Sequence, residues 1–301
     1  MPERSSVVFQ SRDEKIRSAL VKAIETWKTP YDISPQGVFG SLAVIKTDTV
    51  TIRSETLDVE FKVPFDDDME PNEAEIVVYN LSDNTIKQLK KNDKLTIEAG
   101  YRGDTGVLFS GYISKVKTVT EVVDKVTTIY AVDDIETPGV ESIAFAKGTK
   151  ASYILRSLVQ RTGIPIAVFS VRRDHTYKDS VTVDGDLMEN IKKYAEVCGI
   201  SVYVNKGKIY ARYIKEGDNL NFVVSTETGM IGSPSAYSEE VKAEDFTDTV
   251  NGYEVEMLLQ HRISTGAIVQ LKSKSATGTY RVCSGEHRFS PDEAVTKIKM
   301  Y

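Results

Sequence analysis

The chain has 301 residues, of which 41% are hydrophobic and 27% are charged. This composition fits a folded protein with two or three domains and excludes a disordered chain. The formal net charge of -6 at pH 7 disfavours specific nucleic-acid binding or attachment to an anionic membrane, because both need clustered lysine and arginine. The sequence has no apolar run long enough for a membrane anchor and no signal peptide at its N-terminus, so we expect the chain to fold in a cytoplasm.

The first predicted element is an amphipathic helix over residues 13–28. One face carries large apolar residues at helical spacing: Ile16, Leu20, Ile24 and Trp27. Two prolines and a glycine break the pattern between residues 29 and 37. We therefore interpret residues 1–38 as a helical extension and linker. Its apolar stripe either binds a partner or packs on its own domain, and the sequence favours neither.

Residues 39–147 are predicted to form a small antiparallel β-barrel or sandwich. Hydrophobic residues alternate in "VTIRSETLDVEFKV" and "EAEIVVYNL", as they do in strands with one buried face. The "RGDT" segment at 102–105 indicates a hairpin turn. One short helix interrupts the strands, with Ser82 as its N-cap and Ile86 and Leu89 facing inward.

Residues 148–216 are predicted to be a compact α+β domain. The first helix is expected to begin at Thr149 as N-cap and to end at Gly163, and the second is capped by Asp186 and ended by Gly199. The expected buried stripes are Ile154, Leu155, Leu158 and Val159 on the first helix, and Leu187, Ile191, Tyr194, Ala195 and Cys198 on the second. A hairpin that turns at residues 205–207 follows them.

Residues 217–301 return to alternating strands and are predicted to be a second β-barrel domain. Residues 94–111 and 267–285 share a pattern of strand, polar glycine turn, strand and glycine. The match is in pattern and not in identity, but it suggests two related barrels. The predicted fold class is therefore β-rich α+β, with two small antiparallel, tube-like β-barrels, an intervening α+β domain and an N-terminal amphipathic helix.

The segment "GTYRVCSGEHRFSPDEAV" gathers Cys283, Glu286, His287 and Asp292. A metal site needs three or four converging ligands, and no HxxH, HxH or HExxH motif occurs in the chain. We interpret these residues as structural parts of a hairpin with a bulge near Ser284. The "DDDME" run at 66–70 lacks the spacing of a calcium loop and is interpreted as a solvated turn. No catalytic, cofactor-binding or metal-ligating residue is therefore predicted.

Residues 73–116, "EAEIVVYNLSDNTIKQLKKNDKLTIEAGYRGDTGVLFSGYISKV", resemble the first barrel of baseplate hub proteins in phage tails. The C-terminal "GTYRVCSGEHRFS" resembles the closing hairpin of the same family, in which His287 would pack or hydrogen-bond. The resemblance extends over residues 40–301. It implies a homotrimeric ring in which three chains with two barrels each give pseudo-sixfold symmetry.

Such a ring would join a hexameric tail tube or distal tail protein to a trimeric central spike, and would let DNA or the tape measure protein pass. The resemblance places the protein in the tail baseplate of a virion, after assembly in the host bacterial cytoplasm. The N-terminal 35 residues match nothing in the family. We expect no appended lysozyme or peptidase domain, and therefore expect any cutting of the cell wall to come from a partner. Two alternatives stay open: a receptor- or glycan-binding tail protein, and a cell-wall hydrolase.

Overall fold

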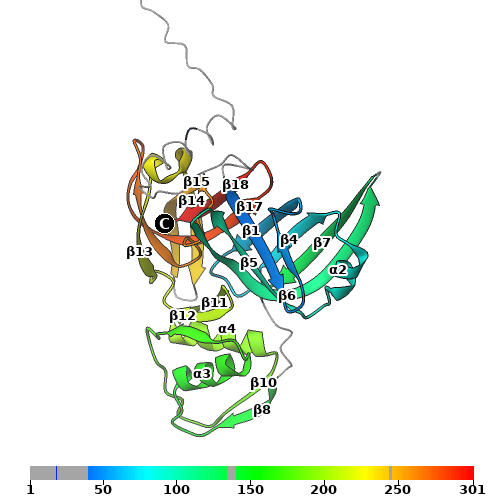
Figure 1. Cartoon of the computed structure of the whole chain (residues 1–301). Helices are drawn as coiled ribbons and strands as arrows, with labels where there is room; N and C mark the ends of the chain where they lie inside the picture. Colours follow the sequence, from blue (N-terminus) through cyan, green and yellow to red (C-terminus); the bar gives the residue numbers. More distant parts are fainter. Residues whose placement is uncertain (1–17, 19–39, 122, 134–139, 244–245) are drawn as a thin grey trace, which may run out of the picture.

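The computed structural model describes residues 18, 40–121, 123–133, 140–243 and 246–301. Two β-rich segments from opposite ends of the described chain share one sheet of 13 strands, and a smaller α+β unit lies beneath it in the view of Figure 1. The β-rich α+β fold class predicted from the sequence is confirmed. The helix predicted over 13–28 lies outside the described residues.

The first β-unit comprises residues 40–133. Its strands are β1 (Ser41–Thr47), β2 (Thr51–Arg53), β3 (Val59–Phe65), β4 (Glu73–Tyr79), β5 (Lys94–Tyr101), β6 (Asp104–Glu121) and β7 (Asp124–Val132). They pair antiparallel in the order β2-β1-β5-β6-β7-β4-β3. Among these described strands no pairing joins β2 to β3, so the sheet stays open. The helix α2 (Asp83–Gln88) begins as predicted, with the Ser82 hydroxyl accepting from the Thr85 N–H.

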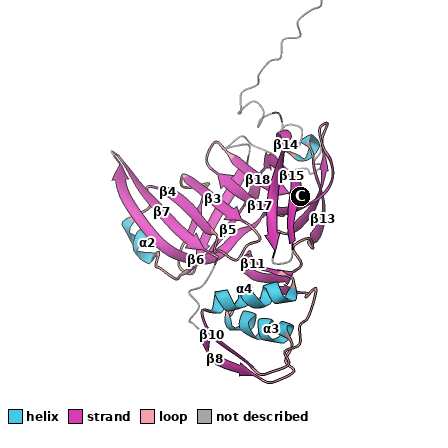
Figure 2. Cartoon of the chain, turned by 180° about the vertical axis from the view of Figure 1, so that it is seen from behind, coloured by secondary structure: helices cyan, strands magenta, loops and turns pink. Residues whose placement is uncertain are grey.

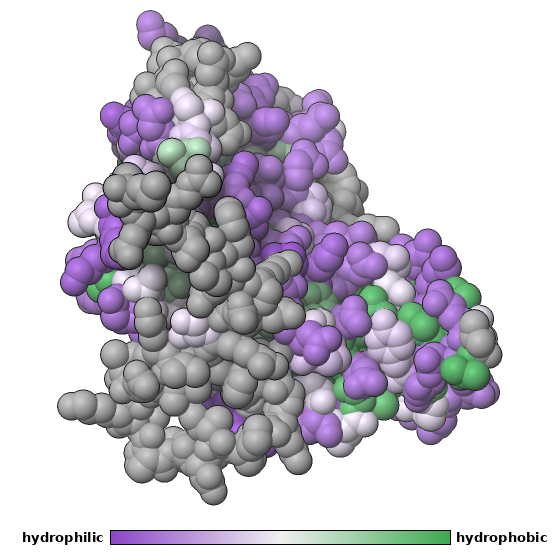
Figure 3. Space-filling model, turned by 90° about the horizontal axis from the view of Figure 1, so that it is seen from above, coloured by the Kyte–Doolittle hydropathy of each residue, from purple (hydrophilic) through white to green (hydrophobic). Residues whose placement is uncertain are grey.

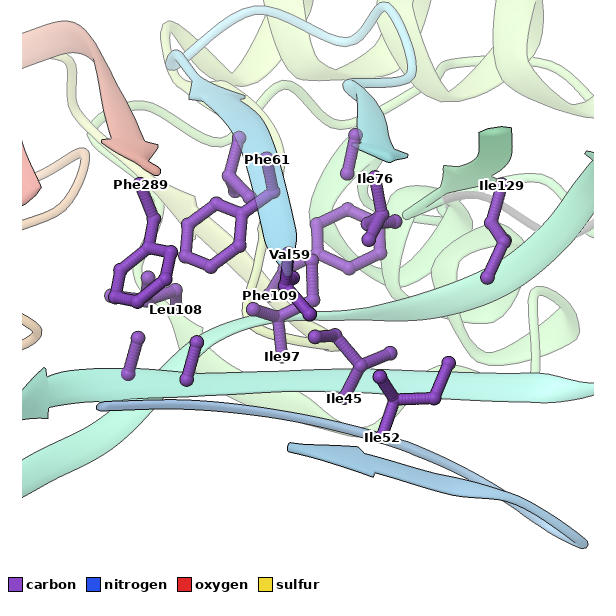
Figure 4. Close-up of a cluster of buried hydrophobic side chains, with 14 of the residues drawn as sticks. Ile45, Ile52, Val59, Phe61, Ile76, Ile97, Leu108, Phe109, Ile129 and Phe289 are labelled. Carbon is purple, nitrogen blue, oxygen red and sulfur yellow. The ribbon is translucent and has the colours of Figure 1, made fainter. Parts of the chain in front are cut away.

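Alternation along the strands builds the core of this unit. In β3, Val59, Phe61, Val63 and Phe65 are buried while the residues between them are more exposed. The matching faces of β1, β4, β5 and β7 meet them, and Figure 4 shows these aliphatic and aromatic side chains converging between the strands. Every second residue thus enters the core because a pleated strand points its side chains to opposite faces.

The central α+β unit contains two helices and two small sheets. Its elements are β8 (Val140–Phe145), α3 (Ala151–Arg161), β9 (Ile166–Phe169), β10 (Val181–Gly185), α4 (Leu187–Cys198), β11 (Ser201–Asn205) and β12 (Lys208–Arg212). β8 pairs with β10, and β12 pairs with both β11 and β9. Because Phe145 of β8 belongs to the same hydrophobic core as residues of both helices, and β8 pairs with β10, we propose that this unit begins near residue 140 and not at residue 148.

Both predicted helical stripes of the central unit are buried, each residue as expected. Asp186 caps α4 by accepting from the Glu189 N–H at 2.9 Å, and Gly199 ends it in the left-handed conformation. The prediction that Thr149 caps α3 is wrong, because its hydroxyl donates to the Ala146 carbonyl oxygen. Asp174 takes this role from a distant loop, accepting from the backbone N–H and the hydroxyl of Ser152.

The second β-unit comprises residues 218–301. Its elements are β13 (Asp218–Val224), a 3-10 turn η1 (Thr226–Thr228), β14 (Met230–Ala243), β15 (Phe246–Leu258), β16 (Ala267–Lys272), β17 (Thr277–Phe289) and β18 (Ala294–Met300). β14 was not predicted from the sequence. Its first half, "MIGSPSAYS", contains glycine, proline and small polar residues typical of a loop. Such residues are tolerated because β14 pairs only with β15 among the described strands.

The two β-units repeat the same strand order. The second unit reads β13-β16-β17-β18-β15-β14, and the first reads β1-β5-β6-β7-β4-β3 once β2 is set aside. Strands in equivalent positions also follow one another in the same chain order. One pairing differs in direction, since β1 runs antiparallel to β5 whereas β13 runs parallel to β16. The weak sequence echo falls on the equivalent hairpins β5–β6 and β16–β17.

Candidate functional site

The two β-units meet where β3 pairs with β17. Five residue pairs join them, from Gly285 opposite Phe65 to Phe289 opposite Phe61. The rings of Phe61 and Phe289 stack with centroids 5.2 Å apart, and Figure 4 shows Phe289 lying beside Phe61 in the core of the first unit. Since backbone pairing and a shared core both cross the boundary, the relative orientation of the two units is fixed.

A buried ion pair reinforces this junction. Arg281 of β17 is 4% exposed and donates from Nη1 to the carboxylate of Asp67, in the loop after β3. Its Nε donates to the Glu216 carbonyl oxygen at 2.9 Å, which adds the segment leading out of the central unit. Burial raises the pKa of Asp67, and the guanidinium of Arg281 opposes that rise. The interpretation of residues 66–70 as a solvated turn is therefore wrong for Asp67.

The loop between β15 and β16, residues 259–266, contacts all three units. Arg262 donates two hydrogen bonds to Asp104, at 2.7 and 2.6 Å, and Nε2 of His261 lies 3.0 Å from the same carboxylate. Burial raises the pKa of Asp104, but the hydrogen bonds from Arg262 and His261 outweigh it and leave that pKa below its ordinary value. The aspartate of the "RGD" sequence thus holds the β5–β6 hairpin against the second unit.

The turn between β11 and β12 attaches the central unit to the same loop. The amide of Asn205 donates to the Ser264 hydroxyl at 3.0 Å, and Nζ of Lys206 donates to the His261 carbonyl oxygen at 2.5 Å. Burial lowers the pKa of Lys206 to about 8. A Cβ on Gly207 would lie 3.1 Å from the Ser110 hydroxyl of β6, so only a small residue fits this approach.

His287 packs and hydrogen-bonds inside the β17–β18 hairpin, as predicted. It is 0% exposed, its Nδ1 lies 2.9 Å from the Thr296 hydroxyl, and its ring contacts Phe65. Burial lowers its pKa well below the ordinary value, and the nearby charges of Lys206 and His261 lower it further. The backbone register is interrupted between Val282 and Ser284, beside the predicted bulge.

The other members of the C-terminal cluster do not converge with His287. Glu286 pairs with Arg288 at 3.2 Å, Cys283 lies 3.7 Å from the Tyr237 hydroxyl, and Asp292 is exposed in the turn before β18. Within the part of the chain that the structure describes, no three His, Cys, Asp or Glu side chains are placed to hold a metal ion. Over the same residues, no helix has the length and apolar character to cross a membrane.

The proposed partner-binding stripe lies outside the described residues. It comprises Ile16, Leu20, Ile24 and Trp27. The residues that hold the three units together were not predicted, because each contacts a partner far away in sequence. Asp67 and Arg281, for example, are 214 positions apart. The one local signal was the acidic run at 66–68 followed by a proline at 71, which is an unusual exit for a buried strand.

Solved structures with a similar fold include two tail proteins and a component of a secretion system. The tail protein from Neisseria meningitidis MC58 has a TM-score of 0.63 at 8% identity, over 87% of this chain and 96% of that chain. The 43 kDa tail protein of prophage MuSo2 from Shewanella oneidensis has a TM-score of 0.61 at 8% identity, over 86% and 97%.

The E. coli c3393 protein has a TM-score of 0.60 at 10% identity, over 85% of this chain and 76% of that chain. It is described as a component of the type VI secretion system with structural similarity to the T4 bacteriophage tail proteins gp27 and gp5. At such low identity these likenesses show the fold alone. They define the class, which is a β-rich fold shared by tail proteins and this secretion component.

The family model for baseplate hub gp41 matches residues 55–287, which is most of the chain. The chain therefore belongs to the baseplate hub gp41 family, a family of structural proteins of the phage tail baseplate. The resemblance identified at residues 73–116 is confirmed. No curated protein has a matching sequence.

Proposed function

We propose that this protein forms a homotrimeric ring at the centre of the baseplate, where it adapts a hexameric tail tube to a trimeric central spike. The observation that carries the proposal is the repeated strand order of the two β-units. Three chains with two similar units each present six similar surfaces to a sixfold tube. The same ring keeps true threefold symmetry, as a trimeric spike requires.

The rigid joint between the two β-units supports this role. Six surfaces match a sixfold tube only if the two units of each chain keep a fixed angle. The β3–β17 pairing, the Phe61–Phe289 stack and the buried Asp67–Arg281 pair all resist a change in that angle. Polar contacts at the 259–266 loop then hold the central unit in place.

The charges on the outward sheet face suit a ring through which DNA or the tape measure protein passes. Lys297 pairs with Glu254 across β18 and β15, and Lys46 pairs with Glu98 across β1 and β5 at 2.9 Å. Lysines neutralised in this way attract a polyanion weakly, which agrees with the net charge of -6. The proposed partners are this chain itself, the tail tube or distal tail protein, the spike and the tape measure protein.

We propose that the protein has no enzymatic activity of its own and is assembled in the host cytoplasm into the virion baseplate. The family's structural role supports this, and it makes a receptor- or glycan-binding protein or a cell-wall hydrolase the less favoured reading. The apolar stripe of residues 16–27 is proposed to bind a neighbouring tail protein.

The experiment is a mass measurement of the purified chain in solution, alone and mixed with the neighbouring tail proteins. We expect a species of three times the chain mass of 33.5 kDa, alone or once the partners are added. A chain that stays monomeric in every mixture and cleaves or binds cell-wall glycan would contradict the proposal and support one of the alternatives.

A further inference from the structure

The last part of β6 and the strand β14 each leave one edge without a partner among the described strands. β5 covers one edge of β6 as far as Tyr112, and beyond the bulge that edge is open from Lys115 to Glu121. β14 pairs with β15 on one edge, and its other edge is open. The end of β6 and the strand β14 lie far apart, on opposite sides of the molecule (Figures 1 and 2). Unpaired backbone groups of this kind can pair with another chain.

The strand equivalent to β6 in the second unit already makes the missing contact. β17 is covered by β16 over its first half and by β3 of the first unit over its second half. In the repeated strand order, β17 is equivalent to β6 and β3 is equivalent to β14. The pairing of β17 with β3 inside one chain therefore corresponds to a pairing of β6 with β14. One chain cannot form the second pairing by itself, because its β6 and β14 lie on opposite sides of the molecule (Figures 1 and 2).

The equivalent strands β6 and β17 each have a β-bulge at the same point, and the two bulges align the two strands residue by residue. The β6–β7 register is interrupted between Ile113 and Lys115, and the β17–β18 register between Val282 and Ser284. Directly after it, the first unit aligns four residues across β6, β7, β4 and β3: Lys115, Tyr130, Glu75 and Lys62. The second unit aligns four across β17, β18, β15 and β14: Ser284, Lys299, Glu254 and Ser235.

We propose that the open edge of β6 in one copy pairs antiparallel with the open edge of β14 in the next copy, so that a continuous sheet closes around the ring. Within the chain, Arg288 pairs with Lys62. Because Ser284 is equivalent to Lys115, the residue four positions later in β17, Arg288, is equivalent to Val119 in β6. In the same alignment Lys62 of β3 is equivalent to Ser235 of β14. The predicted register therefore sets Val119 opposite Ser235 of the next copy.

The side chains at these edges fit such a contact. Val119 is 41% exposed, the neighbouring Val123 is 84% exposed, and Ser235, Ala236 and Ser238 are small and exposed. The space-filling view shows apolar side chains at the surface of the lobe formed by the first unit (Figure 3). Small residues on β14 let a second strand approach, and pairing would cover Val119.

The contact is head-to-tail, because different surfaces of two copies meet. Such an interface generates a ring when the rotation between copies closes and a filament when it does not. The proposed β6–β14 contact between copies repeats the β17–β3 contact between the two β-units of one chain. The same rotation therefore relates each β-unit to the next around the proposed ring. The inference rests on the proposed ring, and it adds which strands form the contact and in which register.

The test is a disulfide between neighbouring copies. Val119→Cys and Ser235→Cys are introduced together in a Cys283→Ser background, because Cys283 lies near Tyr237 of β14 and a serine keeps that polar contact. Cys198 is buried and is left in place. Residues directly opposite on antiparallel strands have Cβ atoms about 4.5–5.5 Å apart. We expect mild oxidation of the full chain to convert most of it into covalent dimers and trimers.

The matched control pairs Val119→Cys with Ala236→Cys, which moves the second cysteine to the opposite sheet face. We expect little cross-linking from this pair and none from either single variant. Equal cross-linking in both pairs would overturn the register and the proposal. If the variant with Val119→Cys and Ser235→Cys forms an oligomer of normal mass without a disulfide between copies, the edge pairing is wrong. The proposed ring is then unaffected. A monomer under all conditions overturns both.

A second variant tests the edge without a covalent bond. Ser235→Arg places a bulky, charged side chain at the proposed contact, on an exposed strand position that does not enter the core. We expect ring formation to need at least tenfold more protein. Thr51→Arg makes the same change on β2, an exposed edge outside the proposed contact, and should leave assembly unchanged. A ring that is equally stable in both variants contradicts the proposal.

Discussion

At the scale of single residues, the most informative contacts are the buried polar ones. Arg281 is 4% exposed, yet it reaches a carboxylate, a backbone carbonyl and, at 3.4 Å, the Tyr301 hydroxyl. A buried charge is tolerated when its partners are supplied, and it costs most when one partner is removed. These contacts bring together parts of the chain from the first unit, the linker after the central unit and the C-terminus.

Asp67→Asn should destabilise the protein strongly, because it leaves the buried guanidinium of Arg281 without a counter-charge. We expect the free energy of unfolding to fall by about 3–5 kcal/mol, measured by chemical denaturation. Glu98→Gln, which breaks the partly exposed pair with Lys46, should cost no more than about 1 kcal/mol. Equal effects of the two variants would show that the Asp67–Arg281 pair does not stabilise the junction.

His287 should make stability depend on pH in the mildly acidic range. Its pKa in the folded protein is lowered, so the folded state binds fewer protons than the unfolded state, whose imidazole titrates near 6.5. The contribution is intact above about pH 6.5, and below it the free energy of unfolding falls by up to about 1.4 kcal/mol per pH unit.

The pKa of Asp66 is raised to about 6, so protonation of this carboxyl increases the free energy of unfolding as the pH falls from about 6 to about 4. The effect of His287 is therefore measured as the difference between the native protein and a His287 variant. Denaturation at several pH values should show a smaller loss on acidification in His287→Gln than in the native protein. His175→Gln, at an exposed position, should keep the native profile. Parallel profiles for the native protein and His287→Gln would disprove the assignment.

At the scale of elements, the two helices of the central unit follow their local sequence and the edge strand β14 does not. α3 and α4 bury the residues that helical periodicity selects, because a helix places every third or fourth side chain on one face. β14 carries no alternation in its first half, and its register with β15 shifts between Ile231 and Ser235. It is a strand because β15 offers an edge, not because its own residues favour one.

Leu158→Asp should unfold the central unit, since Leu158 is fully buried between α3 and its neighbours. An unpaired carboxylate in that core costs several kcal/mol, so we expect a clear fall in thermal stability by calorimetry or circular dichroism. Gln160→Asp, an exposed position on the same helix, is the matched control and should cost less than about 1 kcal/mol. Native thermal stability in Leu158→Asp would mean that this face of α3 is not buried.

At the scale of the whole molecule, the central feature is one sheet built from two units with the same strand order. The units pair through β3 and β17, and the α+β unit is attached through the turn at Asn205 and Lys206. This organisation makes the chain a pair of similar blocks with a rigid joint, as the proposed threefold ring requires.

Deleting residues 1–30 should separate assembly of the ring from its attachment. Because the proposed ring contact lies on β6 and β14, we expect the truncated chain to keep the native mass in solution. Binding to the neighbouring tail protein, measured by co-purification and by tail assembly, should be lost. Ile24→Asp in the full chain should reproduce the loss, and Glu25→Asp should not. Normal tail assembly by the truncated chain would disprove the proposed binding through the apolar stripe of residues 16–27 and would leave the hub assignment unaffected.

The sequence by itself determined the features that depend on neighbours along the chain. Alternation specified the strands of the first unit, helical periodicity specified α3 and α4, and the pattern at residues 73–116 specified the family. Capping by Ser82 and Asp186 was predictable for the same reason, since each bonds a backbone group three residues away.

Only the tertiary structure decided how these elements join. Three of these contacts involve residues distant in sequence: β3 pairs with β17, β8 pairs with β10, and Asp174 instead of Thr149 accepts hydrogen bonds at the start of α3. Periodicity says which face of an element is apolar but not which other element covers it. The burial of Asp67 against Arg281 is set by such long-range contacts, and therefore the residues that hold the hub together carry no local signal.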